Sequence, residues 1–207
     1  MKNYFLFILV MSSFKMIAQT SVADSLLQIG NYQAAIERYK VGPESEFKIA
    51  RVYTQMGDVY AALASYEQGF KRDSLSLQPR FEYARIALGN NDPVTAFDKL
   101  LKLTTEVPDN ASYHYYMGKA YEDLNNDAAA ISAFAKAVSL NTSYRAARIE
   151  LVKLLLKNRK FYKAVQSATI GLNIYPEDIK MNSLIAQSYF GGKRYDKAIA
   201  HFELLFS

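Results

Sequence analysis

The sequence contains no cysteine and no tryptophan among its 207 residues. Without cysteine the chain can form no disulfide framework, no thiolate metal site and no cysteine nucleophile. This absence does not identify the compartment, because it suits reducing and oxidising surroundings alike. Histidine is almost as scarce, since the chain has only His114 and His201.

Neither histidine belongs to a catalytic motif. Neither has a nearby cysteine or paired carboxylates, and the motifs His-Glu-x-x-His, Gly-x-x-x-x-Gly-Lys-Ser/Thr and Gly-x-Ser-x-Gly are all absent. Gly191-Gly192 and the acidic segment 122–127 fit turns between helices better than a phosphate cradle or a calcium loop. We therefore expect a non-catalytic chain that has no catalytic residues, no cofactor and no metal.

The first 18 residues differ from the rest of the chain. A positively charged start precedes an unbroken apolar run over 4–11, and the segment ends in Met16-Ile17-Ala18. This order is typical of a secretory signal peptide cleaved after Ala18, and a buried N-terminal helix is the alternative. The apolar run is too short for a permanent anchor. The sequence therefore predicts export to the bacterial periplasm or cell envelope, with no stable membrane span in the mature chain.

The remaining composition is that of a folded protein with a mild positive charge. Half of the residues are hydrophobic, which is enough for a core. Only 22% are charged, which is not the composition of a disordered chain. Removal of residues 1–18 takes away Lys2 and Lys15 and lowers the net charge from +5 to +3. A balance this close to neutral does not predict nucleic-acid binding.

One pattern recurs every 34 residues from Pro43 onwards. Alanine occupies position 20 of each unit: Ala62, Ala96, Ala130, Ala164 and Ala198. Positions 7, 8 and 11 lie on one face of a first helix, and positions 20, 21 and 24 lie on one face of a second helix. Turn residues separate the two helices, as in Gly57-Asp58 and Asn125-Asn126-Asp127. Each unit is therefore expected to be a helix–turn–helix.

This pattern resembles the tetratricopeptide repeat, which is a 34-residue helix–turn–helix unit. The resemblance covers residues 20–207 and implies an all-α, right-handed α-solenoid of antiparallel helix pairs, whose first helices line a concave groove. After the signal peptide (1–18) and an irregular first repeat (19–42), the five units are 43–76, 77–110, 111–144, 145–178 and 179–207, which makes about six repeats.

Position 4 departs from the family, in which a large aromatic is often found. Its residues here are polar: Glu46, Arg80, His114, Arg148 and Asn182. We expect these residues to weaken individual repeats without changing the fold.

Two further positions of the first helix are expected to face the groove. Position 5 reads Phe47, Phe81, Tyr115 and Ile149 in four successive units, and position 9 reads Arg51, Arg85, Lys119 and Lys153. An apolar row beside a basic row suits an extended acidic peptide with spaced apolar side chains, because cations form charge-assisted hydrogen bonds with carboxylates. The alternative is that the cations are solvated or pair with acids, while the aromatic rings pack between repeats.

The C-terminal end of the sequence is apolar. Leu204, Leu205 and Phe206 follow the second helix of the last unit, and no polar closing helix comes after them. Either the chain is a piece of a longer protein, or this end contacts another subunit end to end.

The expected function is a protein-interaction scaffold that binds a peptide or protein. The alternative is the N-terminal solenoid of a larger envelope enzyme, sensor or assembly factor.

Overall fold

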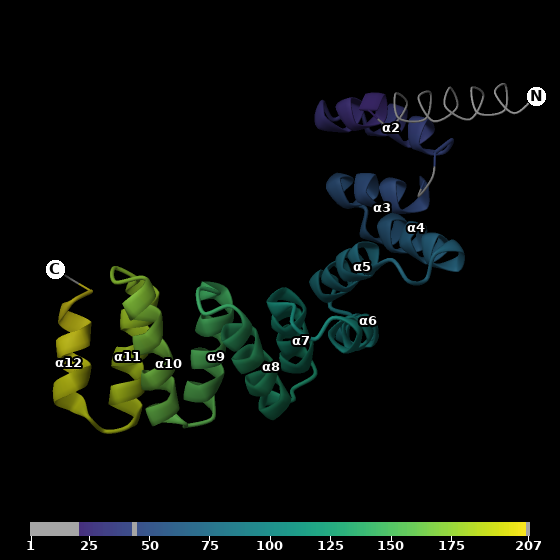
Figure 1. Ribbon diagram of the computed structural model, residues 1–207. Helices are drawn as coiled ribbons and strands as arrows, with labels where there is room; N and C mark the ends of the chain where they lie inside the picture. The colour runs from purple at the N-terminus through teal and green to yellow at the C-terminus, as the bar shows by residue number, and fades with distance from the viewer. Residues whose placement is uncertain (1–20, 43–44, 206–207) are drawn as a thin grey trace, which may run out of the picture. The chain divides into compact units, whose positions relative to one another are not determined.

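The computed structural model describes residues 21–42 and 45–205, and their regular secondary structure is α-helical throughout. The expected signal peptide lies outside these ranges. Residues 21–28 form a first helix, which is followed by α2 (Tyr32–Tyr39), α3 (Ser45–Met56), α4 (Val59–Arg72), α5 (Leu77–Gly89), α6 (Pro93–Glu106), α7 (Ala111–Asp123), α8 (Asp127–Leu140), α9 (Arg145–Lys157), α10 (Phe161–Ile174), α11 (Ile179–Gly191) and α12 (Tyr195–Glu203) (Figure 1). Within the described ranges, no helix is both long enough and apolar enough to cross a membrane.

The turns between α3 and α4, between α5 and α6, and between α7 and α8 use residues that suit their backbone. Each turn has one residue in the left-handed region, namely Gly57, Asn91 and Asn125 at φ 79°, 56° and 59°. Glycine and asparagine adopt this conformation more readily than other residues. The next residue caps the second helix: Asp58, Asp92 and Asn126 accept hydrogen bonds from the backbone N–H groups of Ala61, Thr95 and Ala129 at 3.0–3.1 Å. These turns therefore stabilise the start of the helix that follows.

The chain divides into two compact units between Asn90 and Asn91. In the first unit, α2 packs on α3, α3 on α4 and α4 on α5. Its core contains an aromatic cluster in which the ring of Tyr66 lies 6.3 Å from that of Phe70 and 6.2 Å from that of Tyr83. Tyr66 is position 24 of its repeat and is fully buried, so the face that positions 20, 21 and 24 share is the one that packs here.

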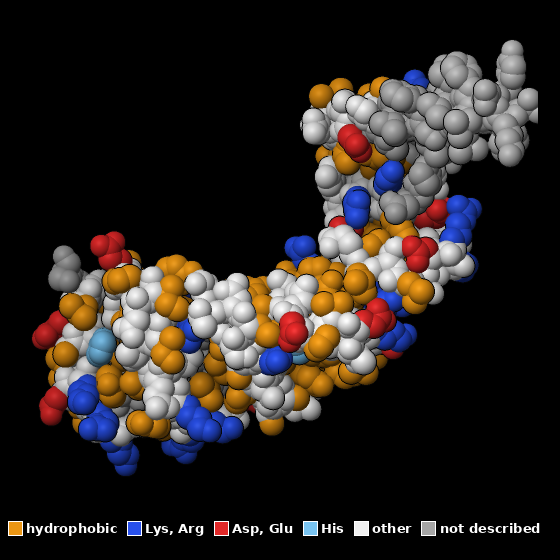
Figure 2. Space-filling view, viewed as in Figure 1, with side chains coloured by type: hydrophobic (Ala, Val, Ile, Leu, Met, Phe, Trp, Pro, Cys, Tyr) orange, Lys and Arg blue, Asp and Glu red, His pale blue; other side chains and the backbone are white. Residues whose placement is uncertain are grey.

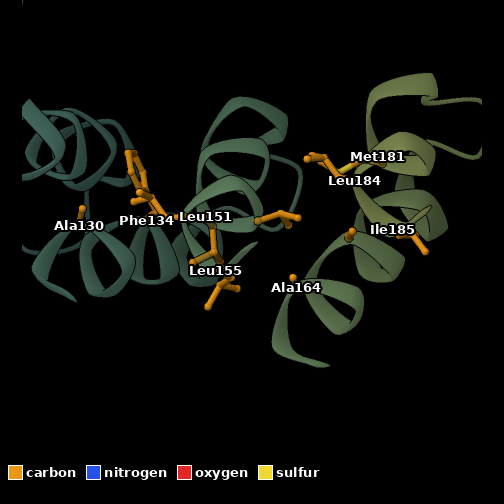
Figure 3. Packing of buried hydrophobic residues seen from close by; sticks show 11 residues of the cluster. Ala130, Phe134, Leu151, Leu155, Ala164, Met181, Leu184 and Ile185 are labelled. Carbon is orange, nitrogen blue, oxygen red and sulfur yellow. The ribbon is translucent and has the colours of Figure 1, made fainter. Parts of the chain in front are cut away.

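In the second unit, each helix from α6 to α12 packs on the next. Figure 3 shows the core between α8 and α11, where the labelled residues point into the space between the helices: Ala130, Phe134, Leu151, Leu155, Ala164, Met181, Leu184 and Ile185. Phe134 is fully buried against Gly118, where an added Cβ would lie 2.6 Å from the ring. The small residue at position 8 thus admits the large one at position 24, and the prediction of an all-α solenoid of helix pairs is confirmed.

The polar residues at position 4 are held by specific bonds. The loss of an aromatic ring at position 4 was expected to weaken the repeats, but the polar residues that replace it form bonds of their own. Three of them reach the carbonyl oxygen six residues earlier: Arg80 Nη2 donates to Ser74 (2.6 Å), His114 Nε2 bonds to Pro108 (2.7 Å) and Arg148 Nη2 donates to Thr142 (2.8 Å). Glu46 instead pairs with Arg72 at 2.6 Å, and Asn182 contacts His201 Nδ1 at 3.2 Å. These bonds tie a first helix to the preceding loop or to a second helix.

Candidate functional site

In the first unit, the candidate residues are Phe47 and Arg51 on α3 and Phe81 and Arg85 on α5, here called the 47–85 face. Phe47 does not belong on an accessible surface, because it is 4% exposed. Its ring lies 5.4 Å from that of Phe70, and it covers Gly69, where an added Cβ would meet the ring at 2.3 Å. The expectation that Phe47 faces a ligand is therefore wrong, since its ring completes the packing of α3 on α4.

The cations of the 47–85 face are already engaged. Arg51 Nε donates to Glu82 Oε2 at 2.9 Å, and the hydroxyl of Tyr66 donates to the same oxygen at 2.7 Å. Burial alone would raise the pKa of Glu82, but the hydrogen bonds from Arg51, Gln78 and Tyr66 together hold it below its usual value. The guanidinium carbon of Arg85 lies 5.9 Å from the centre of the Phe81 ring. For Arg51, the structure thus supports the alternative that the cations pair with acids of a neighbouring helix.

In the second unit, the candidates are Tyr115 and Lys119 on α7 and Ile149 and Lys153 on α9, here called the 115–153 face. Tyr115 and Ile149 are half-buried and pack against the core. The Tyr115 ring lies 5.7 Å from Phe134. The apolar members of this face, Tyr115 and Ile149, are therefore partly accessible, and their contacts with the core fix their positions.

Both lysines of the 115–153 face contact acids on their own helices. Lys119 Nζ lies 3.0 Å from Glu122 Oε2, and Lys153 Nζ lies 2.7 Å from Glu150 Oε2. Burial acts to lower the pKa of Lys119, but Glu122, and then Glu150 and Asp123, raise it above its usual value. Since Glu150 acts on Lys119 across the gap from α9 to α7, the two helices present one connected set of charges.

The two faces therefore carry alternating charges where the sequence suggested a row of cations. Glu82 and Glu150, the acids that the sequence analysis missed, both occupy position 6, three residues before a position-9 cation. For Glu150 this spacing was the available signal, because side chains three residues apart on a helix are neighbours. Glu82 instead pairs with Arg51, which lies 31 residues earlier, and spacing along one helix does not indicate that pair. The side chains of Lys119 and Lys153 are still 34% and 48% exposed, so a ligand can reach them.

The two histidines have separate roles in packing. His114 bonds to the carbonyl of Pro108, and His201 lies 3.2 Å from Asn182, with burial lowering the pKa of its imidazole. Among residues 21–42 and 45–205, no group of three or more histidines, cysteines or acids is placed to hold a metal ion.

At the C-terminal end, Leu204 is 58% exposed. Leu205 is half-buried and lines an open recess of ≈ 640 Å³ together with Arg145 and Asp178. Phe206 lies outside the described residues. An end-to-end contact through these residues stays a prediction.

Two segments of the chain match models of the tetratricopeptide repeat family, residues 45–74 and residues 94–147. The helices α3 and α4, and those from α6 to the start of α9, thus match the sequence of the tetratricopeptide repeat, a unit that generally mediates protein–protein interaction. No curated protein matches the chain in sequence.

Several solved structures share the fold. The crystal structure of MamA is 23% identical, with a TM-score of 0.73 over 77% of this chain and 87% of that one. A tetratricopeptide repeat protein from Parabacteroides merdae ATCC 43184 is 18% identical, with a TM-score of 0.74 over 92% of this chain and 78% of that one. YrrB, described as a TPR protein with an unusual peptide-binding site, is 18% identical, with a TM-score of 0.70 over 84% and 90%. At these identities the similarity shows the fold alone.

Proposed function

We propose that the chain is a non-catalytic interaction scaffold, exported to the bacterial cell envelope, whose 115–153 face binds an extended peptide that carries carboxylates and spaced apolar side chains. The 47–85 face offers the same chemistry through Arg51, Phe81 and Arg85. The observation that carries the proposal is the combination of exposed cations and half-buried apolar side chains on α7 and α9. Tetratricopeptide repeat proteins bind peptides or proteins, which supports the class of function.

A peptide carboxylate can reach Lys119 or Lys153 by replacing the acid that each lysine now contacts. An ion pair at the surface contributes about 0–1 kcal/mol, so exchanging one carboxylate for another requires little free energy. Tyr115 and Ile149 lie one turn before these lysines and offer apolar contacts whose positions the core already fixes. Glu122 and Glu150 also repel a carboxylate that is placed out of register, which gives the face directionality.

The proposal is tested with peptides selected on the protein itself from a display library of short random sequences. The binding of an enriched acidic peptide is measured by fluorescence anisotropy with the wild type, with the double variant Lys119→Glu and Lys153→Glu, and with Lys136→Glu as a control on the exposed surface of α8. We expect the double variant to bind at least about tenfold more weakly, since two charge-assisted hydrogen bonds are lost. Unchanged affinity in a folded double variant would refute the assignment of this face.

Export rests on the signal peptide expected in residues 1–18, and N-terminal sequencing of the protein recovered from the envelope tests it. A start at Gln19 supports export and cleavage, and an intact Met1 in the cytoplasm contradicts it.

The end-to-end contact is tested separately by sedimentation of the wild type and of the double variant Leu204→Ser and Leu205→Ser. Association that is unchanged by these substitutions removes this end as the interface.

A further inference from the structure

The turns inside the last two helix pairs break the pattern of the three before them. Where the earlier turns have glycine or asparagine followed by aspartate or asparagine, these have Arg159-Lys160 and Lys193-Arg194. Arg159 and Lys193 adopt the left-handed conformation, at φ 56° and 59°. Lys160 and Arg194 stand at the caps of α10 and α12, where their side chains form no capping hydrogen bond.

All four residues are unfavourable choices for the stability of the turn. The left-handed region disfavours residues other than glycine, asparagine and aspartate. A lysine or arginine at the cap offers no acceptor to the free N–H groups and places a positive charge at the positive end of the helix dipole. Sequences commonly depart from such local rules where a residue serves function. Here the same departure occurs twice, at equivalent positions, and each time it adds two cations.

These cations belong to a wider separation of charge along the sequence. Residues 145–207 contain eleven lysines and arginines against five acids, whereas residues 19–144 contain twelve against fifteen. We call the cations of the two turns, together with one from the first turn of each following helix, the basic turn edge: Arg159, Lys160, Lys163, Lys193, Arg194 and Lys197. All six are exposed, and within the described part of the chain none of them forms an ion pair. Figure 2 shows blue side chains gathered along the edge below α10, α11 and α12.

Exposed aromatic rings lie among these cations. Tyr162 is 74% exposed, Phe190 60% and Tyr195 52%, and the rings of the last two meet edge to face at 5.6 Å. A single exposed ring is normal on a protein surface, but Phe190 and Tyr195 touch each other and form a contiguous apolar patch, which is the kind of surface that marks interaction sites. The rings therefore add an apolar component to the positive edge.

One recess joins the two turns. An open cavity of ≈ 390 Å³ is lined by Phe161 and Tyr162 at the start of α10 and by Arg194 and Lys197 at the start of α12. Lys197 Nζ lies 5.6 Å from the centre of the Tyr189 ring, which also lines the cavity. The two turns thus form one surface, with apolar walls in the recess and cations around it.

We propose that the basic turn edge docks onto an anionic phospholipid surface. Phosphate groups accept charge-assisted hydrogen bonds from lysine and arginine, and each such cation near an anionic membrane adds attraction. Tyrosine and phenylalanine rings are favoured at the boundary between headgroups and hydrocarbon. The cations and rings stand on two projecting turns side by side, which suits a broad flat surface better than a single extended chain. This docking involves residues outside the 115–153 face, so a bound peptide and a membrane do not compete for the same side chains.

The test compares the full chain with a variant in which both turns carry asparagine, the residue found in the earlier turns. Its substitutions are Arg159→Asn, Lys160→Asn, Lys193→Asn and Arg194→Asn. The control removes four exposed cations elsewhere: Lys40→Gln, Lys71→Gln, Lys102→Gln and Lys136→Gln. Co-sedimentation is measured with phosphatidylcholine vesicles that contain or lack phosphatidylglycerol. The asparagine variant keeps Lys2, Lys15 and the apolar run 4–11, so the difference between wild type and variant on phosphatidylglycerol vesicles isolates the contribution of the basic turn edge.

We expect binding of the wild type that depends on phosphatidylglycerol and is lost at high salt. The four-asparagine variant should bind at least about tenfold more weakly, and the glutamine control should bind like the wild type. Tyr162→Ala should also weaken binding, while the circular dichroism spectrum stays unchanged. The proposal is overturned if the folded asparagine variant binds the anionic vesicles as tightly as the wild type, if the control loses binding equally, or if the wild type prefers a single-stranded oligonucleotide to these vesicles at the same salt.

Discussion

The guanidinium of Arg148 donates to the carbonyl oxygen of Thr142, six residues earlier, at 2.8 Å. Arg80 makes the equivalent bond to Ser74 at 2.6 Å, and both arginines are 4% exposed. Burial lowers the pKa of Arg148, but an arginine side chain remains protonated in proteins. A buried cation therefore takes the place of an aromatic ring and links the loop between two repeats to the helix that follows it.

Replacement of Arg148 by methionine should lower the free energy of unfolding by about 1–3 kcal/mol. The methionine can fill much of the same space, but the carbonyl groups of Thr142 and Ser167 lose a buried donor. Urea unfolding followed by circular dichroism measures the change. Arg38→Met on the exposed side of α2 is the control, and a loss of equal size there would show that the hydrogen bonds of Arg148 are unimportant.

Gly118→Ala should destabilise the fold by about 1–3 kcal/mol, although alanine has the higher helix propensity. The added Cβ would lie 2.6 Å from the buried ring of Phe134, so the ring must move. Gly89→Ala is the matched control, because an added Cβ there has no neighbour within 4 Å, and this substitution should be neutral or slightly stabilising. Thermal unfolding of both variants, and of Gly118→Ala with Phe134→Leu, measures the effect. The double variant should recover part of the loss, and no recovery would argue against the steric explanation.

Asp178 should make the stability of the second unit sensitive to acid. The hydrogen bond from Arg145 Nε, at 2.6 Å, is the main cause that lowers the pKa of Asp178 from its ordinary value of 3.8, and burial acts in the opposite direction. A lowered pKa in the folded state stabilises the fold at neutral pH, and this contribution disappears as the pH falls below 3.8 towards the lowered value. Asp178→Asn should therefore be less stable than the wild type at neutral pH, by about 1–2 kcal/mol, and show a shallower loss on acidification.

The pH dependence is measured by urea unfolding at a series of pH values. Asp196→Asn, on the exposed surface of α12, is the control and should follow the wild type. A pH profile of Asp178→Asn that is parallel to the wild type would contradict the assigned role of Asp178.

Lys160→Asn and Arg194→Asn should each raise the free energy of unfolding by about 0.5–2 kcal/mol, because asparagine accepts a hydrogen bond from the free N–H groups at the start of α10 or α12. Asn126→Ala is the opposite control and should lower it by a similar amount, since Asn126 caps α8. Thermal unfolding compares the three variants. If the two asparagine substitutions destabilise the protein, the cations have a structural role, and their unfavourable placement is no longer an argument for function.

The sequence was sufficient to predict the helix pairs. The alanines at position 20 of all five units and the large residues at position 24 of four of them recur at a fixed spacing, because the pairs pack against their neighbours in a similar way. The core of α8 to α11, with Phe134 buried against Gly118, follows directly from that pattern. The expected signal peptide and the partner stay predictions.

The sequence was not sufficient to tell which surface residues are available to a partner. Phe47 and Tyr115 occupy the same position of their repeats, yet the glycine at Gly69 lets the Phe47 ring sink into the core, while Tyr115 stays partly accessible. Helical spacing gives the direction in which a side chain leaves its helix, but not how closely the neighbouring helix approaches. Accessibility depends on that approach, and it was decided by the tertiary structure.

The sequence by itself determined the repeat, its helices and the positions of its cations. The tertiary structure decided what each cation contacts: Arg148 is buried against backbone carbonyls, Arg51 pairs with Glu82 of the next repeat, and Lys160 projects from a turn. The physical reason is that local propensity and apolar periodicity act within a repeat, whereas the partner of a charge depends on side chains that distant residues bring to it. Positively charged residues thus have three different places in the molecule: one links a loop to a helix, another belongs to a candidate binding face, and a third belongs to the basic turn edge.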